Sequence, residues 1–332
     1  MRRGSILRMV TIGVVAGVVT ALVAVLVPWL PTSASKEMDR IEFVFWFATV
    51  ISVAIFALVT AVLVYMVVKF RAAPDDESDG PPIHGHTGLE IAWTVVPAVL
   101  VTAIAVVSAI ALSRNSDAGP NPVQVHVVAQ QFAWKFEYPG SGVTSGRLVL
   151  PVGRSTQLEL ASLDVIHSFW VPEFGQKSDA VPGITTRLVI TPTRLGTFPV
   201  ICTELCGLGH ATMRSEVQVV PQEEFDAWLA EQKGGATAGG GAALFTAQGC
   251  GACHALAAAG TDSQVGPSLD DVAKAAAGAG LPVDEFVRES ILEPDKVIAA
   301  GYAKGVMPST FTGLPQDQLD ALVGFVVSGK GS

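Results

Sequence analysis

Three long apolar stretches in the first third of the chain constrain its fold more than any other feature. They cover residues 9–30, 43–68 and 91–112. Each is long enough to cross a bilayer, whose hydrocarbon core takes about 20 helical residues. Pro97 is tolerated in the third stretch because a neighbouring helix can relieve the lost hydrogen bond. The sequence therefore predicts a membrane protein, in agreement with an apolar fraction of 50% and a charged fraction of 15%.

The first stretch has the features of a secretory signal peptide. Arg2, Arg3 and Arg8 precede it, and the small residues "PTSAS" follow it. An uncleaved helix is the alternative, so residues 1–34 are expected to be a signal peptide or an extra membrane helix.

The second and third stretches predict a transmembrane hairpin over residues 35–115. Lys69 and Arg71 directly follow the second stretch, and the positive-inside rule then places the loop 71–89 in the cytoplasm. Everything after residue 113 is expected outside the cytoplasm. His84 and His86 lie in this solvated loop and receive no role.

Glu90 begins the third stretch, in "LEIAWTVVP". An acidic residue at a helix N-terminus interacts favourably with the helix dipole, by less than about 1 kcal/mol. A carboxylate at the mouth of a membrane helix can also collect protons. The residue by itself favours the first interpretation.

Residues 122–220 contain short β-type runs separated by glycine and proline turns. The runs are "VQVHVV", "RLVLP", "TQLEL", "TRLVI" and "FPVIC". This spacing predicts an antiparallel sandwich or barrel, to which we assign residues 116–232. His126 alternates with valines and is expected on the polar face of its strand.

A sulfur-rich loop follows the last of these runs. In "ICTELCGLGHATM", Cys202, Cys206, His210 and Met213 are four, four and three residues apart. His167 lies earlier, in "DVIHSFWVP", and loops at one end of a sandwich can bring such distant positions together.

The residue types in this loop predict a metal site. One cysteine, two histidines and a weak methionine bind mononuclear copper, and here a second cysteine is added. Two thiolates four residues apart can bridge two copper ions, each with one histidine. Met213 would be a weak ligand of one ion and a backbone carbonyl a ligand of the other. A closed zinc tetrahedron is the alternative, but it leaves Met213 unexplained.

A second motif lies beyond the stretch "KGGATAGGG" at residues 233–241, which predicts a flexible linker. Cys250, Cys253 and His254 form C-x-x-C-H, the attachment motif of c-type haem. A thioredoxin-like motif is the rival, but it needs a βαβ context that is missing here.

The sixth haem ligand is predicted by elimination. Beyond residue 240 the chain has one methionine, Met307, and no histidine other than His254. Met307 is therefore the expected axial ligand, although it could also be core filler.

The sulfur-rich loop, in the stretch "CTELCGLGHATM", resembles the CuA loop of subunit II of haem–copper cytochrome c oxidases. The segment "DVIHSFWVPEFGQKSDAVPG" resembles the family segment that carries the first CuA histidine. The resemblance implies bridging thiolates, one histidine on each copper, a methionine ligand and a backbone carbonyl ligand. The bridging thiolates correspond to Cys202 and Cys206, and the histidines correspond to His167 and His210. The methionine ligand corresponds to Met213, and the carbonyl ligand corresponds to Glu204. It also implies that the Glu204 carboxylate reaches a magnesium ion at the interface with subunit I.

Two further positions follow from this resemblance. Glu90 matches the carboxylate at the mouth of the family's K proton pathway, which reverses the preference stated above. The family's "Q-W-Y-W" stretch, whose first tryptophan accepts electrons from cytochrome c, is "Q-F-A-W" here. Phe132 thus replaces the electron-accepting tryptophan, and Trp134 remains as an aromatic near the copper or as part of the core.

Residues 242–332 are expected to form a domain, and the chain resembles small class I cytochromes c over about residues 240–330. "GPSLDDV" resembles the family loop in which a proline carbonyl, here of Pro267, steadies the haem histidine. "LPQDQLDALVGFVVS" is expected to be the C-terminal helix, with Leu319, Leu322, Val323 and Val326 on its apolar face. The expected protein is thus a transmembrane hairpin, a cupredoxin-like β-sandwich and an all-α cytochrome c domain.

These resemblances imply a bacterial cytochrome c oxidase subunit II with a fused cytochrome c. The chain would pass electrons from haem c to dinuclear CuA and on to subunit I, where oxygen is reduced to water with proton pumping. Both cofactor domains would lie on the outer face of the plasma membrane. Implied partners are subunit I, other oxidase subunits, lipid, and an upstream cytochrome c or bc-type donor.

Other functions were weighed against this one. The net charge of −9 argues against nucleic acid as a partner and suits attraction to a basic protein. One rival is a copper-delivery or thiol-redox protein that uses Cys202 and Cys206. Another is a membrane-anchored electron carrier without an oxidase, in which Glu90 and Glu204 would be idle.

Overall fold

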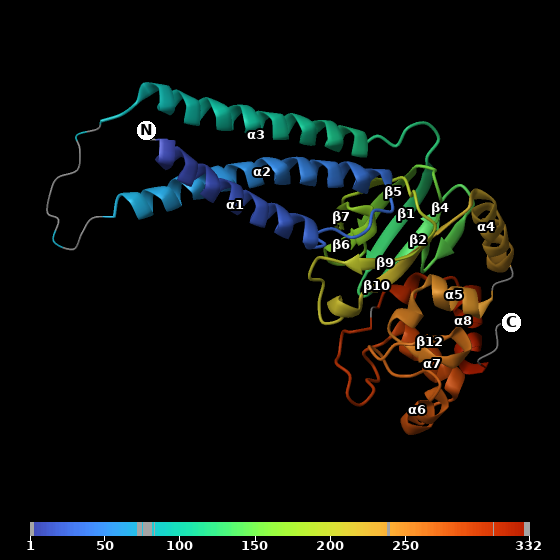
Figure 1. The fold of residues 1–332 in the computed structure, drawn as a ribbon. Coiled ribbons are helices and arrows are strands. Elements are labelled where there is room, and N and C mark those ends of the chain that lie inside the picture. The colour runs from blue at the N-terminus through green and yellow to red at the C-terminus, as the bar shows by residue number, and fades with distance from the viewer. Residues whose placement is uncertain are drawn as a thin grey trace. The chain divides into compact units, whose positions relative to one another are not determined.

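The computed structural model describes residues 3–71, 75, 82, 84–237, 240–307 and 309–328. The chain forms two compact units, whose elements are labelled in Figure 1. One unit holds the three long helices, and the other holds residues 33–38 together with the chain from Asn115 onward. The second unit contains a β-domain followed in the chain by a small, mainly helical domain.

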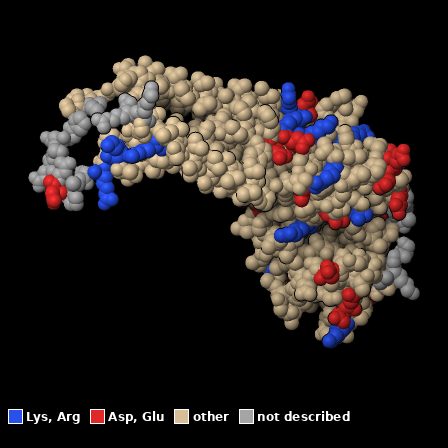
Figure 2. Space-filling model, viewed as in Figure 1, with Lys and Arg blue, Asp and Glu red and all other residues tan. Residues whose placement is uncertain are grey.

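Three helices correspond to the three apolar stretches: α1 Arg3–Leu26, α2 Lys36–Lys69 and α3 Thr87–Asn115. They carry candidate membrane spans of 23, 34 and 29 residues. Most of their large apolar side chains are exposed, and the face in Figure 2 shows little charge along them. Such a surface matches lipid rather than water. Helix α1 ends before its apolar stretch does, because Pro28 disfavours the helical conformation at Val27.

Small residues line the contact between α1 and α2. A Cβ on Gly13 would lie 3.2 Å from Ala61 Cβ, and a Cβ on Gly17 would lie 3.4 Å from Ala57 Cβ. Gly13 and Gly17 are four residues apart in α1, and Ala57 and Ala61 are four residues apart in α2. Each of these two pairs therefore lies on one face of its helix. Small side chains at such a seam let two membrane helices approach closely.

The β-domain consists of two five-stranded sheets. The first has the order β3-β2-β1-β5-β8 and the second β4-β10-β9-β6-β7. The strands of the first are β1 Val123–Gln130, β2 Ala133–Tyr138, β3 Val143–Ser145, β5 Thr156–Ser162 and β8 Thr186–Ile190. Those of the second are β4 Leu148–Pro151, β6 His167–Trp170, β7 Lys177–Ala180, β9 Gly196–Cys202 and β10 Arg214–Val220.

The predicted sandwich is therefore present, but its strands are not all antiparallel. Strand β1 pairs with β5 in parallel, and β10 pairs with β4 in parallel. The chain changes sheet between β3 and β4, so strands that follow each other in sequence are separated in space. Periodicity indicates which face of a strand is buried but carries no information about its partner, which is why the expectation was wrong here.

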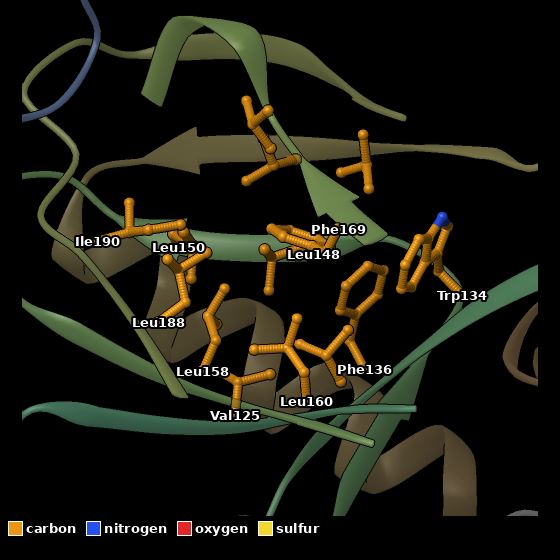
Figure 3. Packing of buried hydrophobic residues seen from close by; sticks show 14 of the residues in the cluster. Val125, Trp134, Phe136, Leu148, Leu150, Leu158, Leu160, Phe169, Leu188 and Ile190 are labelled. Carbon is orange, nitrogen blue, oxygen red and sulfur yellow. The ribbon is translucent and has the colours of Figure 1, made fainter. Parts of the chain in front are cut away.

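The core of the β-domain lies between the two sheets (Figure 3). Val125, Val127 and Ala129 of β1 are fully buried and alternate with more exposed residues, which include His126 as expected. Phe136 and Phe169 meet edge to face from opposite sheets, with ring centroids 6.3 Å apart. Full burial of such side chains stabilises the fold by roughly 1.5–3 kcal/mol each.

Residues 33–38 belong to the same unit as the β-domain, and helix α2 begins within this segment, at Lys36. Ser35 Oγ accepts the amide of Met38 at 3.0 Å, which caps the first turn of α2. The buried carboxylate of Glu37 accepts the amide of Thr191 at 2.7 Å. The segment 33–38 is thus held on the β-domain by buried polar contacts.

The segment expected as a flexible linker is partly helical. Helix α4 covers Gln222–Thr237, so it takes in residues 233–237 of the expected linker; residues 238 and 239 lie outside the described part. Phe225, Trp228 and Leu229 hold the start of α4 on the β-domain core. A helix anchored in this way can extend through glycines at a cost of about 1 kcal/mol each.

The C-terminal domain has its own hydrophobic core. Its helices are α5 Gly241–Ala247, α6 Val272–Ala279, α7 Val283–Leu292 and α8 Gln316–Ser328. The four apolar positions predicted for the last helix are all buried: Leu319, Leu322, Val323 and Val326. The domain is not purely helical, because β11 Ala255–Leu256 pairs with β12 Thr261–Asp262.

Candidate metal centre and haem pocket

Strand pairing brings the two halves of the predicted metal site together. His167 opens β6 and Cys202 ends β9, and these two strands are antiparallel neighbours. After Cys202 the chain leaves the sheet, and the loop that returns to β10 contains Cys206, His210 and Met213. We call this segment, residues 203–213, the copper loop.

The side chains of these five residues converge. Cys202 Sγ lies 3.9 Å from both Cys206 Sγ and His167 Nδ1. Cys206 Sγ lies 3.5 Å from His210 Nδ1 and 3.7 Å from Met213 Sδ. Met213 Sδ also lies 3.1 Å from His167 Nδ1. Four of the five residues are buried, and His210 is half-buried.

The donor atoms fit a copper pair better than a single zinc ion. Both cysteines are free, and their sulfurs are much further apart than the about 2.05 Å of a disulfide. Glu204 O adds a sixth donor, 3.3 Å from Cys202 Sγ. A closed zinc site takes four ligands and would leave the buried Met213 thioether and this carbonyl unused. Thiolate, imidazole and thioether donors together suit copper.

The two thiols differ in acidity in the metal-free protein. Burial raises the pKa of Cys202, but hydrogen bonds from His167 and neighbouring groups outweigh burial and lower that pKa. Burial and the adjacent Cys202 thiolate raise the pKa of Cys206. The first thiolate therefore forms at Cys202, and the second needs a cation to offset its charge.

Asp164 is a functional residue that sequence reasoning missed. Its Oδ1 lies 2.8 Å from His167 Nε2, and its Oδ2 accepts the amide of Gln131 at 2.6 Å. With Nε2 facing a carboxylate, Nε2 carries the proton and Nδ1 is left to bind metal. Gln131 Nε2 also donates to Cys206 O at 2.6 Å, so Gln131 joins both sides of the site. The D-x-x-H spacing in "DVIH" was the available sequence signal for Asp164.

The aromatic residues of "Q-F-A-W" lie beside the copper ligands. Phe132 is buried against the copper loop, where a Cβ on Gly209 would lie 2.5 Å from Phe132 Cδ2. The ring of Trp134 is 6.2 Å from the His167 ring, centroid to centroid, and also packs on Phe169 (Figure 3). Trp134 Nε1 has no hydrogen-bond partner among the described residues. Trp134 is therefore both a core residue and a neighbour of a ligand.

The C-terminal domain lines most of a cavity of about 450 Å³. Cys250, Cys253, His254 and Met307 all line it, so the residues of the haem motif and the expected axial methionine meet in one place. Pockets that enclose small cofactors have volumes of about 300–1,000 Å³. Burial lowers the pKa of His254, which favours the neutral imidazole that a haem iron needs.

The loop around Pro267 orients His254. Pro267 O lies 2.8 Å from His254 Nδ1, so Nδ1 donates and Nε2 is left as the ligand atom. Gly266 packs directly on the ring, where a Cβ would lie 2.7 Å from His254 Cε1. Tyr302, which sequence reasoning missed, donates its hydroxyl to Gly266 O at 3.1 Å and holds this loop.

Glu90 lies in the first turn of α3 and takes part in capping it. Its Oε1 accepts the amide of His86 at 3.0 Å, while His86 Nδ1 accepts the amide of Leu89 at 3.2 Å. The helix-terminus interpretation of Glu90 thus has a structural basis, and a proton-collecting role is compatible with its exposure. The Glu204 side chain is also exposed.

Three family patterns match the chain. Residues 21–110 match "Cytochrome C oxidase subunit II, transmembrane domain", and residues 142–220 match "Cytochrome C oxidase subunit II, periplasmic domain". Residues 239–330 match "Cytochrome c". The three matches follow the order of the helical unit, the β-domain and the haem-binding domain.

Similar proteins include three named "Cytochrome c oxidase subunit 2". The one from Synechocystis sp. is 34% identical over 248 residues, which cover 60% of this chain and 75% of that protein. The one from Alkalihalophilus pseudofirmus is 32% identical over 300 residues, 85% of this chain and 86% of that protein. The one from Thermostichus vulcanus is 34% identical over 281 residues, 67% of this chain and 85% of that protein.

Proposed function

The chain belongs to the cytochrome c oxidase subunit II family, and from that membership we propose how its residues serve the oxidase. It is a subunit of a haem–copper oxidase, with a periplasmic domain and a fused cytochrome c domain. When bound, dinuclear copper and haem c each carry one electron at a time, so the chain transfers electrons to subunit I. Oxygen reduction and proton pumping belong to subunit I.

We assign the copper pair to the cluster at the end of β9. Cys202, Cys206, His167 and His210 would hold the two ions, which together would accept one electron. Met213 and the carbonyl of Glu204 complete the two sites. The observation that carries this assignment is the convergence of two thiols, two imidazoles and a thioether on one buried point. Asp164 keeps Nδ1 of His167 available by holding the proton on Nε2.

We assign haem c to the cavity of the C-terminal domain. Cys250 and Cys253 would attach the haem covalently, and His254 and Met307 would bind its iron, which would donate one electron at a time. Pro267 fixes the orientation of the His254 ring through its carbonyl. Ligation by histidine and methionine raises the reduction potential, which suits a donor to copper.

Several roles rest on family resemblance together with placement. Glu90 is the entrance of a proton pathway that continues in subunit I, and the Glu204 carboxylate binds magnesium at the interface with that subunit. Phe132, which contacts the copper loop, and Trp134, which packs beside the His167 ring, are the candidate aromatic residues of the electron path. The chain is held in the bacterial plasma membrane, in contact with lipid, and its haem receives electrons from a cytochrome c or a bc-type complex. The domains extend over residues 35–115, 116–232 and 242–332.

Spectroscopy of the full chain in detergent tests the cofactor assignment. We expect an EPR signal from two coppers that share one unpaired electron, and the optical bands of a low-spin c-type haem. Cys206→Ser should abolish the copper signal and leave the haem bands intact, whereas Cys250→Ala with Cys253→Ala should do the reverse. A single zinc ion in the β-domain would refute the copper assignment.

Copurification separates the oxidase subunit from a free-standing carrier. A tag on this chain should retain a large polytopic membrane subunit with haem and copper of its own. Isolation of this chain alone from its native membrane, with both cofactors bound, would favour the free-standing carrier.

A further inference from the structure

The haem cavity is not lined by the C-terminal domain alone. Gln131 and Phe132, from the turn between β1 and β2, and Ala133, the first residue of β2, also line it. Phe132 contacts the copper loop as well, because a Cβ on Gly207 would lie 3.2 Å from Phe132 Cζ. One short segment of the β-domain therefore borders both cofactor sites.

Two close approaches bring the domains together at this segment. A Cβ on Gly146, which directly follows β3, would collide with the carbonyl oxygen of Thr246 in α5. A Cβ on Gly249, the residue before Cys250, would lie 2.6 Å from Ala133 Cβ. Gly249 needs to be glycine for its positive φ of 73° in any case, but Gly146 has no such requirement. The lack of a side chain at Gly146 is thus explained by the domain contact itself.

Hydrogen bonds hold the backbone in place at both of these contacts. Ser215 Oγ of β10 donates to Gly146 O at 2.7 Å, and Gly249 donates its amide to Thr246 O at 3.1 Å. The turn Thr246–Gly249 leads directly into the haem-binding cysteines. A larger residue than alanine at position 133 would occupy the space that this turn fills, and the family stretch quoted above has tyrosine there.

We propose that Ala133 and Gly146 form a docking notch for the turn 246–249, which seats the tethered haem domain against Phe132. The notch deepens the proposed function and rests on it, because it specifies which donor faces the copper loop. The side chains at 132 and 133 thereby adapt the β-domain to a donor carried on the same chain. The contact would serve the transfer of one electron from the bound haem to the bound copper pair, with no bond made or broken.

Substitutions in the full chain with both cofactors bound test the notch. Gly146→Ala puts a methyl group into the notch at the end of β3. Ala133→Tyr fills the notch with the tyrosine that stands at this position in the family stretch "Q-W-Y-W". Gly140→Ala is the matched control, because a Cβ on Gly140 meets no atom within 4 Å and its φ is not positive. Copper EPR and haem absorption spectra verify that each variant still folds and binds its cofactors.

Two readouts report docking without turnover. Pulsed EPR measures how strongly the oxidised haem speeds spin relaxation of the copper pair, and hydroxyl-radical footprinting measures the exposure of Phe132, which is 4% in the docked form. We expect both variants to show weaker, more heterogeneous relaxation enhancement and greater labelling of Phe132. Electron transfer from haem to copper after photoreduction should slow by about tenfold or more, because the donor keeps only its tethered effective concentration. The control should match the unmodified chain in all three measurements.

The outcomes distinguish the two levels of the proposal. If the unmodified chain lacks a copper-pair signal or haem bands, the proposed function fails. If it has both and the two variants behave like Gly140→Ala, the docking notch is refuted while the proposed function stands.

Discussion

At the scale of single residues, a carboxylate lies behind one candidate ligand of the proposed copper site. Asp164 accepts hydrogen bonds from His167 Nε2 and from the amide of Gln131. Burial raises the pKa of Asp164, but these hydrogen bonds outweigh burial and lower that pKa, so the group is an anion. An anion at this position fixes the ring orientation and increases the basicity of the ligand nitrogen.

Asp164→Asn should therefore weaken copper binding without removing a ligand. Loss of the partner of a metal-bound histidine lowers metal affinity by about 10–100-fold. Competition with a copper chelator of known affinity measures the effect, and Asp262→Asn, an exposed position in the haem domain, controls for the change in charge. Equal copper retention by the two variants would show that Asp164 does not support His167.

Tyr138 is a second residue whose buried polar group has consequences for stability. Its hydroxyl accepts the amide of Val149 at 2.7 Å and donates to Val149 O at 3.0 Å. Burial raises the pKa of Tyr138, with a smaller opposing effect of the Val149 hydrogen bond. The folded protein thus keeps a proton that the unfolded chain releases above about pH 10, and this contribution to stability is lost as pH rises beyond that value.

Tyr138→Phe should destabilise the β-domain at neutral pH by about 1–3 kcal/mol, since both Val149 groups lose their partner. It should also flatten the decline of stability above about pH 10. Thermal unfolding followed by near-ultraviolet circular dichroism at pH 7 and pH 10.5 measures both effects. Tyr65→Phe, in membrane helix α2, should change neither; an unchanged alkaline decline in Tyr138→Phe would contradict the assignment.

At the scale of elements, the loop between the haem motif and α6 positions the His254 ring, and it can do so because Gly266 has no side chain. Gly266 leaves room for the His254 ring, while Pro267 accepts the ring hydrogen bond and Tyr302 holds the loop from outside. The loop therefore sets the direction of the His254 ring.

Gly266→Ala should displace the imidazole, because its Cβ would come within 2.9 Å of His254 Nδ1. We expect a partly high-spin haem and a shifted midpoint potential, measured by absorption spectra and redox titration. Gly324→Ala is the matched control: it lies in helix α8 outside the haem cavity, a Cβ there meets nothing within 4 Å, and alanine should stabilise that helix by up to about 1 kcal/mol. A low-spin spectrum and unchanged potential in Gly266→Ala would show that the loop tolerates the methyl group.

Sequence reasoning succeeded where one local pattern determines the outcome. The membrane helices, the strand runs and the buried face of α8 follow from periodicity and composition. The metal-site residues could be nominated from residue type and spacing, and the structure brings them together. Parallel pairing of β1 with β5 could not be predicted, because it depends on the path of the chain between distant segments. Asp164, Gln131 and Tyr302 were missed because polar residues of these types are common and only their contacts distinguish them.

At the scale of the whole molecule, the β-domain and the haem domain have separate hydrophobic cores. One core is centred on residues such as Phe136, Leu150 and Phe169, and the other on Phe245, Leu322 and Phe325. Each domain therefore contains its own main source of stability, although Val306 of the haem domain also packs against the β-domain core.

Calorimetry of the full chain should accordingly resolve two transitions outside the membrane helices. Removal of copper should lower the melting temperature of the β-domain transition, because a ligand that binds only the folded state stabilises it. Cys250→Ala with Cys253→Ala should lower only the other transition. A single transition that both changes shift equally would mean that the two domains unfold together.

The separate cores also bear on how such a chain can arise. A reading frame that gains or loses the last 90 or so codons would leave the copper-binding sandwich able to fold. Gene fusion and gene splitting would thus leave the folding of the β-domain intact. Only the small side chains that face the haem domain need to change afterwards. An oxidase lineage could in this way exchange a diffusing donor for a built-in one through few substitutions.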